Sequence, residues 1–155
     1  MLERLGLDRP QPVSQASQSW RLSPFSFPYL FKRFNDTHGH DAGDAVLQAL
    51  GRLLQEHFRQ EDIVCRYGGE EFAVLVDGAS LANGLVRAEG LRLAASEMPL
   101  DFQGRSLGRL ALSVGVTAYE GGDTDTALLI RQADRALYRA KQGGRNQVVA
   151  GSSEG

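Results

Sequence analysis

Two short apolar runs joined by a tight polar turn restrict the fold of this chain more than any other feature. Residues 63–65 read Ile-Val-Cys, residues 72–76 read Phe-Ala-Val-Leu-Val, and Arg-Tyr-Gly-Gly-Glu-Glu lies between them. Apolar runs on either side of a glycine-containing turn predict a β-hairpin, here with strands at 63–67 and 72–76. Because the second run is apolar at every position, we expect its strand to be covered on both faces.

The tip of this predicted hairpin, Gly68–Glu71, is expected to lie exposed at one end of a sheet. A pair of glycines permits a tight turn and leaves room for a ligand backbone or a phosphate to approach. The two adjacent carboxylates, Glu70 and Glu71, repel each other and contribute nothing to a hydrophobic core. Taken alone, the tip is a solvated, charged turn; taken with the polar clusters described below, it is a candidate ligand site.

The spacing of apolar residues predicts the remaining elements. Helical spacing extends over about 44–58, 81–97 and 126–142, and Gly143-Gly144 end the last helix. Alternation predicts a strand at 110–117, with one bulky face and one face of small residues on which a helix can pack closely. A short strand follows at 148–149. This order predicts a single layered α/β domain with a central, mostly antiparallel sheet flanked by helices.

The first 30 residues are expected to be irregular. Their first part is rich in serine and glutamine, and Pro24 and Pro28 interrupt the aromatic run that follows. Each proline removes a donor from a strand ladder, so we expect at most a short strand near Phe25–Phe31.

Composition and charge exclude several classes of function. The chain has 155 residues and a formal net charge of −2, so no global basic field favours binding to duplex nucleic acid. Its single cysteine, Cys65, excludes an internal disulfide and fits a reducing cytoplasm, and its place in a strand predicts a buried apolar side chain. No apolar run is long enough for a bilayer or resembles a signal peptide, so we expect a cytoplasmic domain without a membrane segment.

Polar side chains gather at three further places. Residues 31–44 (Phe-Lys-Arg-Phe-Asn-Asp-Thr-His-Gly-His-Asp-Ala-Gly-Asp) form a predicted polar loop that leads into a helix N-terminus. Such a loop can read a base edge through Asn and Asp side chains, or it can be a capped surface loop. Lys141 and Arg145 end the last helix, where they can clamp phosphate oxygens or compensate the helix dipole. Arg59–Asp62 precedes the hairpin and, alone, predicts a local salt bridge.

With the hairpin tip, these clusters resemble the GGDEF family of diguanylate cyclases. The family's signature is matched by Gly-Gly-Glu-Glu-Phe at 68–72, preceded by Arg-Tyr. Its upstream pattern Phe-Lys-x-x-Asn-Asp-x-x-Gly-His-x-x-Gly-Asp is matched at 31–44, and Ala-Asp-x-Ala-Leu-Tyr-x-Ala-Lys-x-x-Gly-Arg-Asn is matched at 133–146. The motifs stand in the family's order and spacing, so the chain is identified as a member, with its domain at 31–150 and a tail at 151–155.

The resemblance implies a palm-like nucleotide-cyclase fold and an enzyme that condenses two GTP molecules into cyclic di-GMP, with release of pyrophosphate. Two domains, each presenting one nucleotide, would have to meet in a homodimer. The guanine edge would be bound by Asn35 and Asp44, with Leu47 lining its pocket. The cations implied to hold the triphosphate are Lys32, Lys141 and Arg145.

The resemblance also assigns the residues of catalysis and product inhibition. Glu70 would ligate Mg²⁺ and help to activate the attacking 3′-hydroxyl, while Glu71 would support the metal site. The backbone of Gly68 and Gly69 would lie against the phosphates. Such a division of work suits phosphoryl transfer, which depends on positioning and charge neutralisation. The residues implied to bind cyclic di-GMP as an inhibitor are Arg59 and Asp62.

The chain departs from the family before Phe31. There the family has an aliphatic strand that ends in Asp-x-Asp-x-Phe-Lys, and its first aspartate is a metal ligand. Counting back from Phe31 places that ligand at Phe27 and the second aspartate at Tyr29, with Pro28 between them. A site with one carboxylate fewer implies impaired turnover. The alternative function is a non-catalytic module that binds GTP or cyclic di-GMP. A purely structural domain is a third and less favoured alternative.

Overall fold

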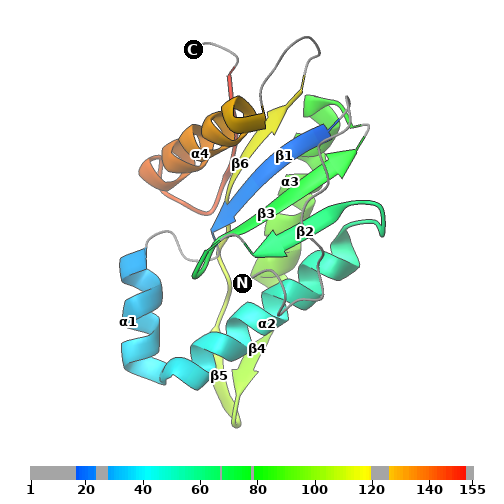
Figure 1. Cartoon of the computed structure of the whole chain (residues 1–155). Coiled ribbons are helices and arrows are strands. Elements are labelled where there is room, and N and C mark those ends of the chain that lie inside the picture. Colours follow the sequence, from blue (N-terminus) through cyan, green and yellow to red (C-terminus); the bar gives the residue numbers. More distant parts are fainter. Residues whose placement is uncertain (1–16, 24–27, 67, 78, 120–125, 153–155) are drawn as a thin grey trace.

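A five-stranded sheet forms the centre of the computed structural model of this chain, which describes residues 17–23, 28–66, 68–77, 79–119 and 126–152 (Figure 1). In spatial order the strands are β2 (Ile63–Arg66), β3 (Phe72–Asp77), β1 (Ser17–Ser23), β6 (Ser113–Ala118) and β7 (Val148–Ala150). Neighbouring strands are antiparallel, except that β7 runs parallel to β6. The predicted layered α/β domain with a mostly antiparallel sheet is therefore confirmed.

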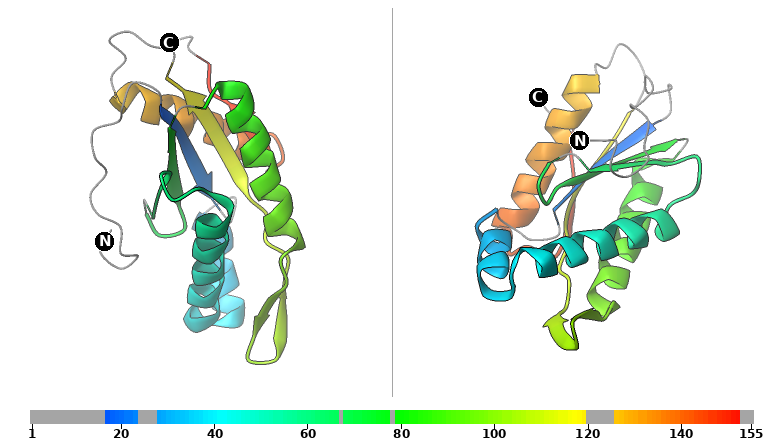
Figure 2. Two further views of the ribbon diagram at one scale, coloured as in Figure 1. Left: turned by 90° about the vertical axis from the view of Figure 1, so that its right-hand side faces the viewer. Right: turned by 60° about the horizontal axis from the view of Figure 1, so that its bottom comes forward.

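Helices cover both faces of this sheet. The helix α4 (Thr126–Gln142) packs against β1 and β6 on one face. The opposite face is covered by α3 (Leu81–Glu97), with α2 (His40–His57) beside it (Figure 2). A shorter helix, α1 (Pro28–His38), precedes α2 and packs on it. The predicted helices at 81–97 and 126–142 and the predicted hairpin at 63–76 are confirmed.

The core fills the space between the sheet and the α2–α3 layer. Apolar side chains at helical spacing on α2 and α3 meet the inward side chains of β2, β3 and β6. Among the buried residues of this cluster are Val46, Leu50, Leu54, Val64, Val74, Val76, Leu91, Val114 and Val116. Cys65 is also buried, as predicted. Within the described part of the chain, no helix is long and apolar enough to cross a membrane.

The strand β6 has the two unlike faces that its sequence predicts. Val114 and Val116 point into the core, while Gly115 lies against the backbone of α4. A Cβ atom added at Gly115 would be 2.3 Å from the Ala133 carbonyl oxygen and 2.4 Å from the Leu137 nitrogen. The small face therefore allows α4 to approach closely. The strand begins at Ser113, so the buried residues just before it, expected to be in the strand, lie outside it.

The prediction that residues 1–30 are irregular is wrong for two segments. The strand β1 is hydrogen-bonded along both edges, with Trp20 opposite Val74 of β3 and Val116 of β6. Serine and glutamine are tolerated there because pairing on both sides satisfies the backbone. The strand ends before Pro24, so no proline interrupts it, and Pro28 opens α1, where a missing N–H costs nothing.

We expect at most a short strand near Phe25–Phe31, and the described part of that segment, from Pro28 on, is helical because it belongs to α1. Residues 24–27, which include Phe27, lie outside the described residues.

The predicted polar loop at 31–44 is helical instead. Phe31 and Phe34 of α1 pack against the core. Polar residues surround these two phenylalanines in the sequence, so their apolar spacing is difficult to recognise there. Gly39, with φ +91°, caps α2 at its N-terminus and lets the chain turn between the two helices. Asp44 therefore lies inside α2 rather than at its start.

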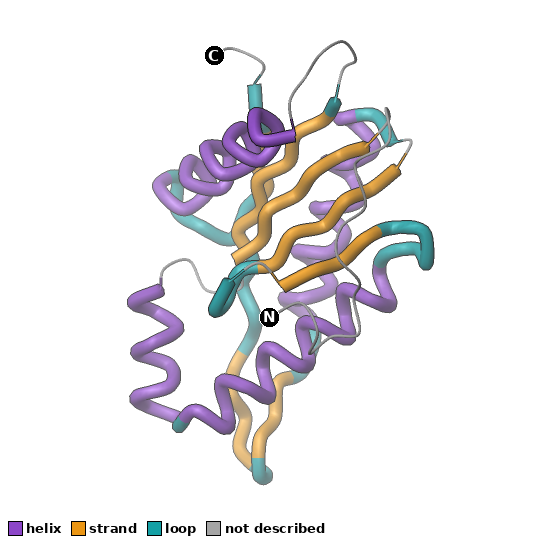
Figure 3. The backbone as a smooth tube through the Cα atoms, in the orientation of Figure 1, coloured by secondary structure: helices purple, strands orange, loops and turns teal. Residues whose placement is uncertain are grey.

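A second, small hairpin was not predicted from the sequence. It consists of β4 (Leu100–Phe102) and β5 (Arg105–Gly108), and it projects away from the main sheet beyond α2 (Figure 3). Its turn is made by Gln103 and Gly104, which both have positive φ. A Gly between short apolar stretches is the available signal, but it is a weak one in strands of three and four residues.

Candidate functional site

The hairpin tip is a tight turn held by its own backbone. The Gly68 N–H donates to the Glu71 carbonyl oxygen at 3.3 Å, and the Glu71 N–H donates to the Gly68 carbonyl oxygen at 3.4 Å. The guanidinium of Arg66 donates to the Gly69 carbonyl oxygen, with its Nε at 2.9 Å. Gly69 is exposed and Glu70 is only half-buried. The tip is therefore exposed at the end of the sheet, as predicted, and it presents Glu70 on a fixed backbone.

The C-terminal end of α4 meets this tip. Lys141 Nζ lies 3.7 Å from Glu71 Oε1, and both side chains are partly buried. Beyond the helix, the Arg145 N–H donates to the Ala140 carbonyl oxygen at 3.0 Å, and Gly144 has φ +113°, so the helix ends in a left-handed glycine cap. The structure thus brings the motif at 133–146 against the hairpin motif, on the side of the sheet where α1 lies (Figure 1).

Asn35 of α1 packs against Gly43 of α2. A Cβ atom at Gly43 would be 1.9 Å from Asn35 Oδ1, so the Asn35 carboxamide occupies space that only glycine leaves. Asn35 Oδ1 is buried and has no hydrogen-bond partner among the described residues. Leu47 is buried nearby on α2, whereas Lys32 and Asp44 are exposed. A buried acceptor without a donor is costly unless a ligand supplies one.

Arg59 and Asp62 have different environments. The Asp62 side chain is 2% exposed, and its Oδ2 accepts bonds from the Arg59 N–H at 2.9 Å and from Arg87 Nη2 of α3 at 2.6 Å. The Arg59 side chain is 75% exposed and lies 3.9 Å from Glu61. Asp62 therefore shapes the turn, while Arg59 faces solvent. Sequence reasoning missed Arg87, because nothing local links it to Asp62.

Carboxylates are scarce around the hairpin tip. Among the described residues, no group of three or more His, Cys, Asp or Glu side chains could hold a metal ion. The end of β1 lies beside the hairpin, since Leu22 pairs with Phe72, but β1 contains neither Asp nor Glu. Glu71 is engaged by Lys141, which leaves Glu70. One carboxylate fits a divalent ion that is bound mainly through the phosphates of a nucleotide.

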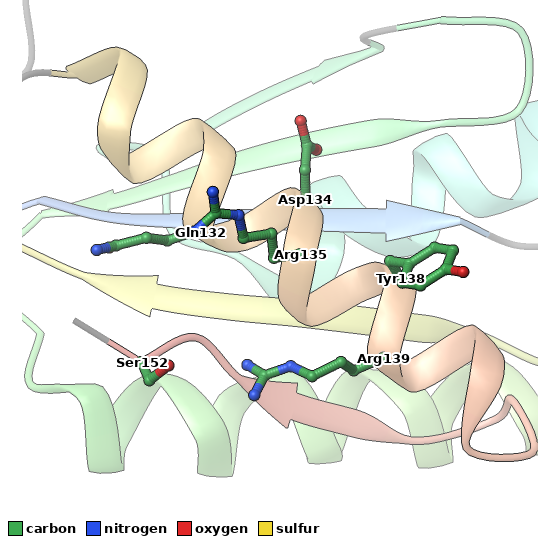
Figure 4. Close-up of a pocket in the computed structure, with 6 residues that line it drawn as sticks. All are labelled: Gln132, Asp134, Arg135, Tyr138, Arg139 and Ser152. Atoms are coloured by element: carbon green, nitrogen blue, oxygen red, sulfur yellow. The ribbon is translucent and has the colours of Figure 1, made fainter. Parts of the chain in front are cut away.

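A hollow among the described residues lies elsewhere. It is lined by Gln132, Asp134, Arg135, Tyr138 and Arg139 of α4 and by Ser152, and these side chains point to different sides of the helix (Figure 4). None of the residues predicted to bind nucleotide lines it, so it is not the candidate site.

Comparison with known proteins identifies the family. Residues 29–147 match the family described as "Diguanylate cyclase, GGDEF domain". The chain belongs to the GGDEF domain family. It is 46% identical over 122 residues to the response regulator PleD of Caulobacter vibrioides, a match that covers 77% of this chain and 27% of PleD. The chain thus spans about a quarter of the length of PleD, and the members of this family generally use a divalent metal.

Solved GGDEF domains share its fold. The active GGEEF domain of a diguanylate cyclase from Vibrio cholerae is 31% identical, with a TM-score of 0.79, over 90% of this chain and 85% of that one. The GGDEF domain of DgcB from Caulobacter crescentus, solved in complex with cyclic di-GMP, is 28% identical, with a TM-score of 0.78, over 87% of this chain and 78% of that one. The first of these carries the same GGEE tetrad that this chain has at its hairpin tip.

Proposed function

We propose that this chain is a diguanylate cyclase domain, which condenses two GTP molecules into cyclic di-GMP and releases pyrophosphate. The observation that carries the proposal is the buried, unpartnered Asn35 Oδ1 in a family member whose motifs at 68–72 and 133–146 meet at the hairpin tip. Each reaction joins two nucleotides, so two copies of the domain must face each other. We place the reaction in the cytoplasm, where GTP is available and a lone buried Cys65 stays reduced.

The proposed guanine site lies between α1 and α2. The Watson–Crick edge of guanine presents two neighbouring donors, N1–H and the N2 amino group. These two donors would bond to two acceptors, the unpartnered amide oxygen of Asn35 and the carboxylate of Asp44. Adenine presents an acceptor at N1, which would leave the Asn35 oxygen unsatisfied. Leu47 would support the plane of the base, and the pair of acceptors would select guanine over adenine.

The proposed triphosphate site joins the hairpin tip to the end of α4. Lys141 lies 3.7 Å from Glu71 at the tip, and Arg145 follows the end of the same helix, so we propose that both cations bind phosphate there. Exposed Lys32 on α1 can reach the same side. Three cations and a glycine backbone suit a highly charged ligand, because charge-assisted bonds to phosphate are strong. The ion pair with Glu71 would hold Lys141 in place when no nucleotide is bound.

The proposed chemistry uses Glu70. The 3′-oxygen of one GTP forms a bond to the α-phosphorus of the other, the bond to pyrophosphate breaks, and Glu70 receives the hydroxyl proton. We propose Mg²⁺ as the metal, held by Glu70 and by the nucleotide. It would neutralise the phosphate charge and polarise the phosphorus. Because Glu71 is paired with Lys141 and β1 carries no Asp or Glu, we expect turnover to be slow.

Product inhibition is proposed at Arg59. Its exposed guanidinium can clamp a phosphate of cyclic di-GMP, while Asp62 keeps the turn in shape through its bond to the Arg59 N–H. DgcB, which this chain resembles in fold, was solved with cyclic di-GMP.

The absence of Asp and Glu from β1 favours a second candidate function, a module that binds GTP or cyclic di-GMP without turnover.

Selective binding of GTP tests the proposal. Asn35→Ala should raise the Kd for GTP about tenfold, since it removes a buried hydrogen bond to the base, and it should leave the weak binding of ATP unchanged. Gly43→Ala should have the same effect, because the new methyl group displaces the Asn35 carboxamide. Titration calorimetry with each nucleotide measures these constants.

The matched control is Gly51→Ala, the same substitution in the same helix. Gly51 is buried, but a Cβ atom there meets nothing within 4 Å, so binding should not change. A wild-type chain that binds ATP as tightly as GTP would contradict the proposed guanine site, as would Gly43→Ala protein with normal affinity.

A further inference from the structure

One side-chain bridge connects α3 to the loop that follows α4. Arg92 of α3 donates from Nη1 to Asn146 Oδ1 at 3.1 Å, and it joins residues that are 54 positions apart. The same guanidinium donates from Nε to Glu89 Oε2 at 2.9 Å and from Nη2 to Glu89 Oε1 at 2.5 Å. Because two of its bonds go to Glu89, one turn earlier on α3, the Arg92 side chain has a fixed direction toward Asn146.

The loop reached by this bridge has an unusual backbone. Gly144, Arg145 and Asn146 have φ values of +113°, +66° and +44° in succession. Glycine adopts such values freely, whereas a side chain such as that of Arg145 makes them costly. A backbone of this kind persists when surrounding contacts hold it. Within the loop region, the Arg145 N–H and Gln147 Nε2 both donate to the Ala140 carbonyl oxygen.

We propose that Glu89 and Arg92 are positioning residues that hold Asn146 and thereby fix the direction in which Arg145 meets the triphosphate. The inference rests on the proposed function only for the identity of the ligand, because the bridge is present in the chain without nucleotide. Arg92 is 16% exposed at its side chain, and its charge is balanced by Glu89, so it acts on the loop rather than on the nucleotide.

The charge state of the bridge is stable around neutral pH. The hydrogen bond from Arg92 lowers the pKa of Glu89, and the same bond raises the pKa of Arg92. Glu89 is therefore ionised and Arg92 protonated under the conditions in which GTP would bind.

Two substitutions at Asn146 distinguish the role of its side chain from the role of its backbone conformation. Asn146→Gly removes the Oδ1 acceptor but adopts φ +44° without strain, so it would be harmless if Asn146 served only the turn. Asn146→Asp keeps an acceptor for Arg92. We expect Asn146→Gly to raise the Kd for GTP roughly fivefold to tenfold, and Asn146→Asp to keep it within about twofold of wild type.

Arg92→Gln is expected to have the same effect as Asn146→Gly, and the double variant should be no worse than either. This non-additivity is the sign of one shared interaction. An exposed arginine of α4, substituted as Arg131→Gln, is the matched control for loss of one positive charge, and it should bind GTP like wild type.

Hydrogen exchange of the Arg145 amide in the nucleotide-free protein gives an independent readout. Its N–H donates to the Ala140 carbonyl oxygen, so loosening of the loop should speed its exchange in Arg92→Gln and in Asn146→Gly but not in Arg131→Gln. Unchanged exchange in both variants would overturn the inference, whatever the nucleotide data. Faster exchange with unchanged GTP affinity would also overturn it. A wild-type chain that binds no GTP would instead remove the proposed function, while the exchange data still decide whether the bridge holds the loop.

Discussion

Conversion of GTP to cyclic di-GMP is expected to rise at least about tenfold when Phe27 is replaced by aspartate, and to vanish when Glu70→Ala is added. A phenylalanine ring offers nothing to a hard cation, whereas an aspartate, which the family resemblance implies as a metal ligand at this position, would hold Mg²⁺ more firmly and neutralise more of the developing charge. An electrostatic interaction in the transition state worth about 1.4 kcal/mol changes the rate tenfold. Product formation with Mg²⁺ present, followed by chromatography, measures the effect.

Two further variants sharpen this test. Phe27→Asn changes the size and polarity of the side chain without adding a charge, so it should not raise turnover. Ser23→Asp places a carboxylate at the end of β1, the strand position that the sheet brings beside the hairpin through the pairing of Leu22 with Phe72. A wild-type chain with high turnover, unchanged by Phe27→Asp, would mean that the metal site is aligned wrongly, and exposed Asp36 would then be the nearest candidate ligand by sequence.

Gly115→Ala is expected to destabilise the domain by about 3 kcal/mol or more, because the added methyl group would overlap two backbone atoms of α4. Backbone cannot move aside as the end of a side chain can, so either α4 must shift or β6 must bend. For a domain of this size, the midpoint of thermal unfolding should fall by roughly 10 °C. Circular dichroism during heating measures it.

The control for this stability prediction is again Gly51→Ala, a buried glycine with open space at its Cβ position. It should unfold at the wild-type temperature or above, since alanine favours helix more than glycine does. Gly115→Ala protein as stable as Gly51→Ala protein would contradict the close contact between α4 and β6.

Most of the fold could be predicted because the apolar periodicity of its elements is strong. The hairpin at 63–76 and the small face of β6 follow from patterns a few residues long. By contrast, β1 is rich in Ser and Gln, and only its pairing with two neighbouring strands explains it. The sequence predicts a loop where α1 lies, because Phe31 and Phe34 stand among polar residues.

The sequence predicts which residues make up the candidate site but not the contacts that those residues make. The motifs name Asn35, Lys141 and Arg145, yet they do not indicate that Asn35 Oδ1 is buried over Gly43. The bonds from Arg87 to Asp62 and from Arg92 to Asn146 join residues far apart in the sequence. Such contacts depend on how α3 packs against the rest of the domain, and no local pattern encodes that packing.

The proposed cyclase activity is tested most directly by incubating the purified chain with GTP and Mg²⁺ and then measuring cyclic di-GMP and pyrophosphate. We expect slow formation of cyclic di-GMP with two pyrophosphates for each product, no product from ATP, and faster formation by Phe27→Asp protein. Absence of product from both wild-type and Phe27→Asp protein, in samples that bind GTP, would contradict the cyclase assignment and leave a nucleotide-binding module in its place.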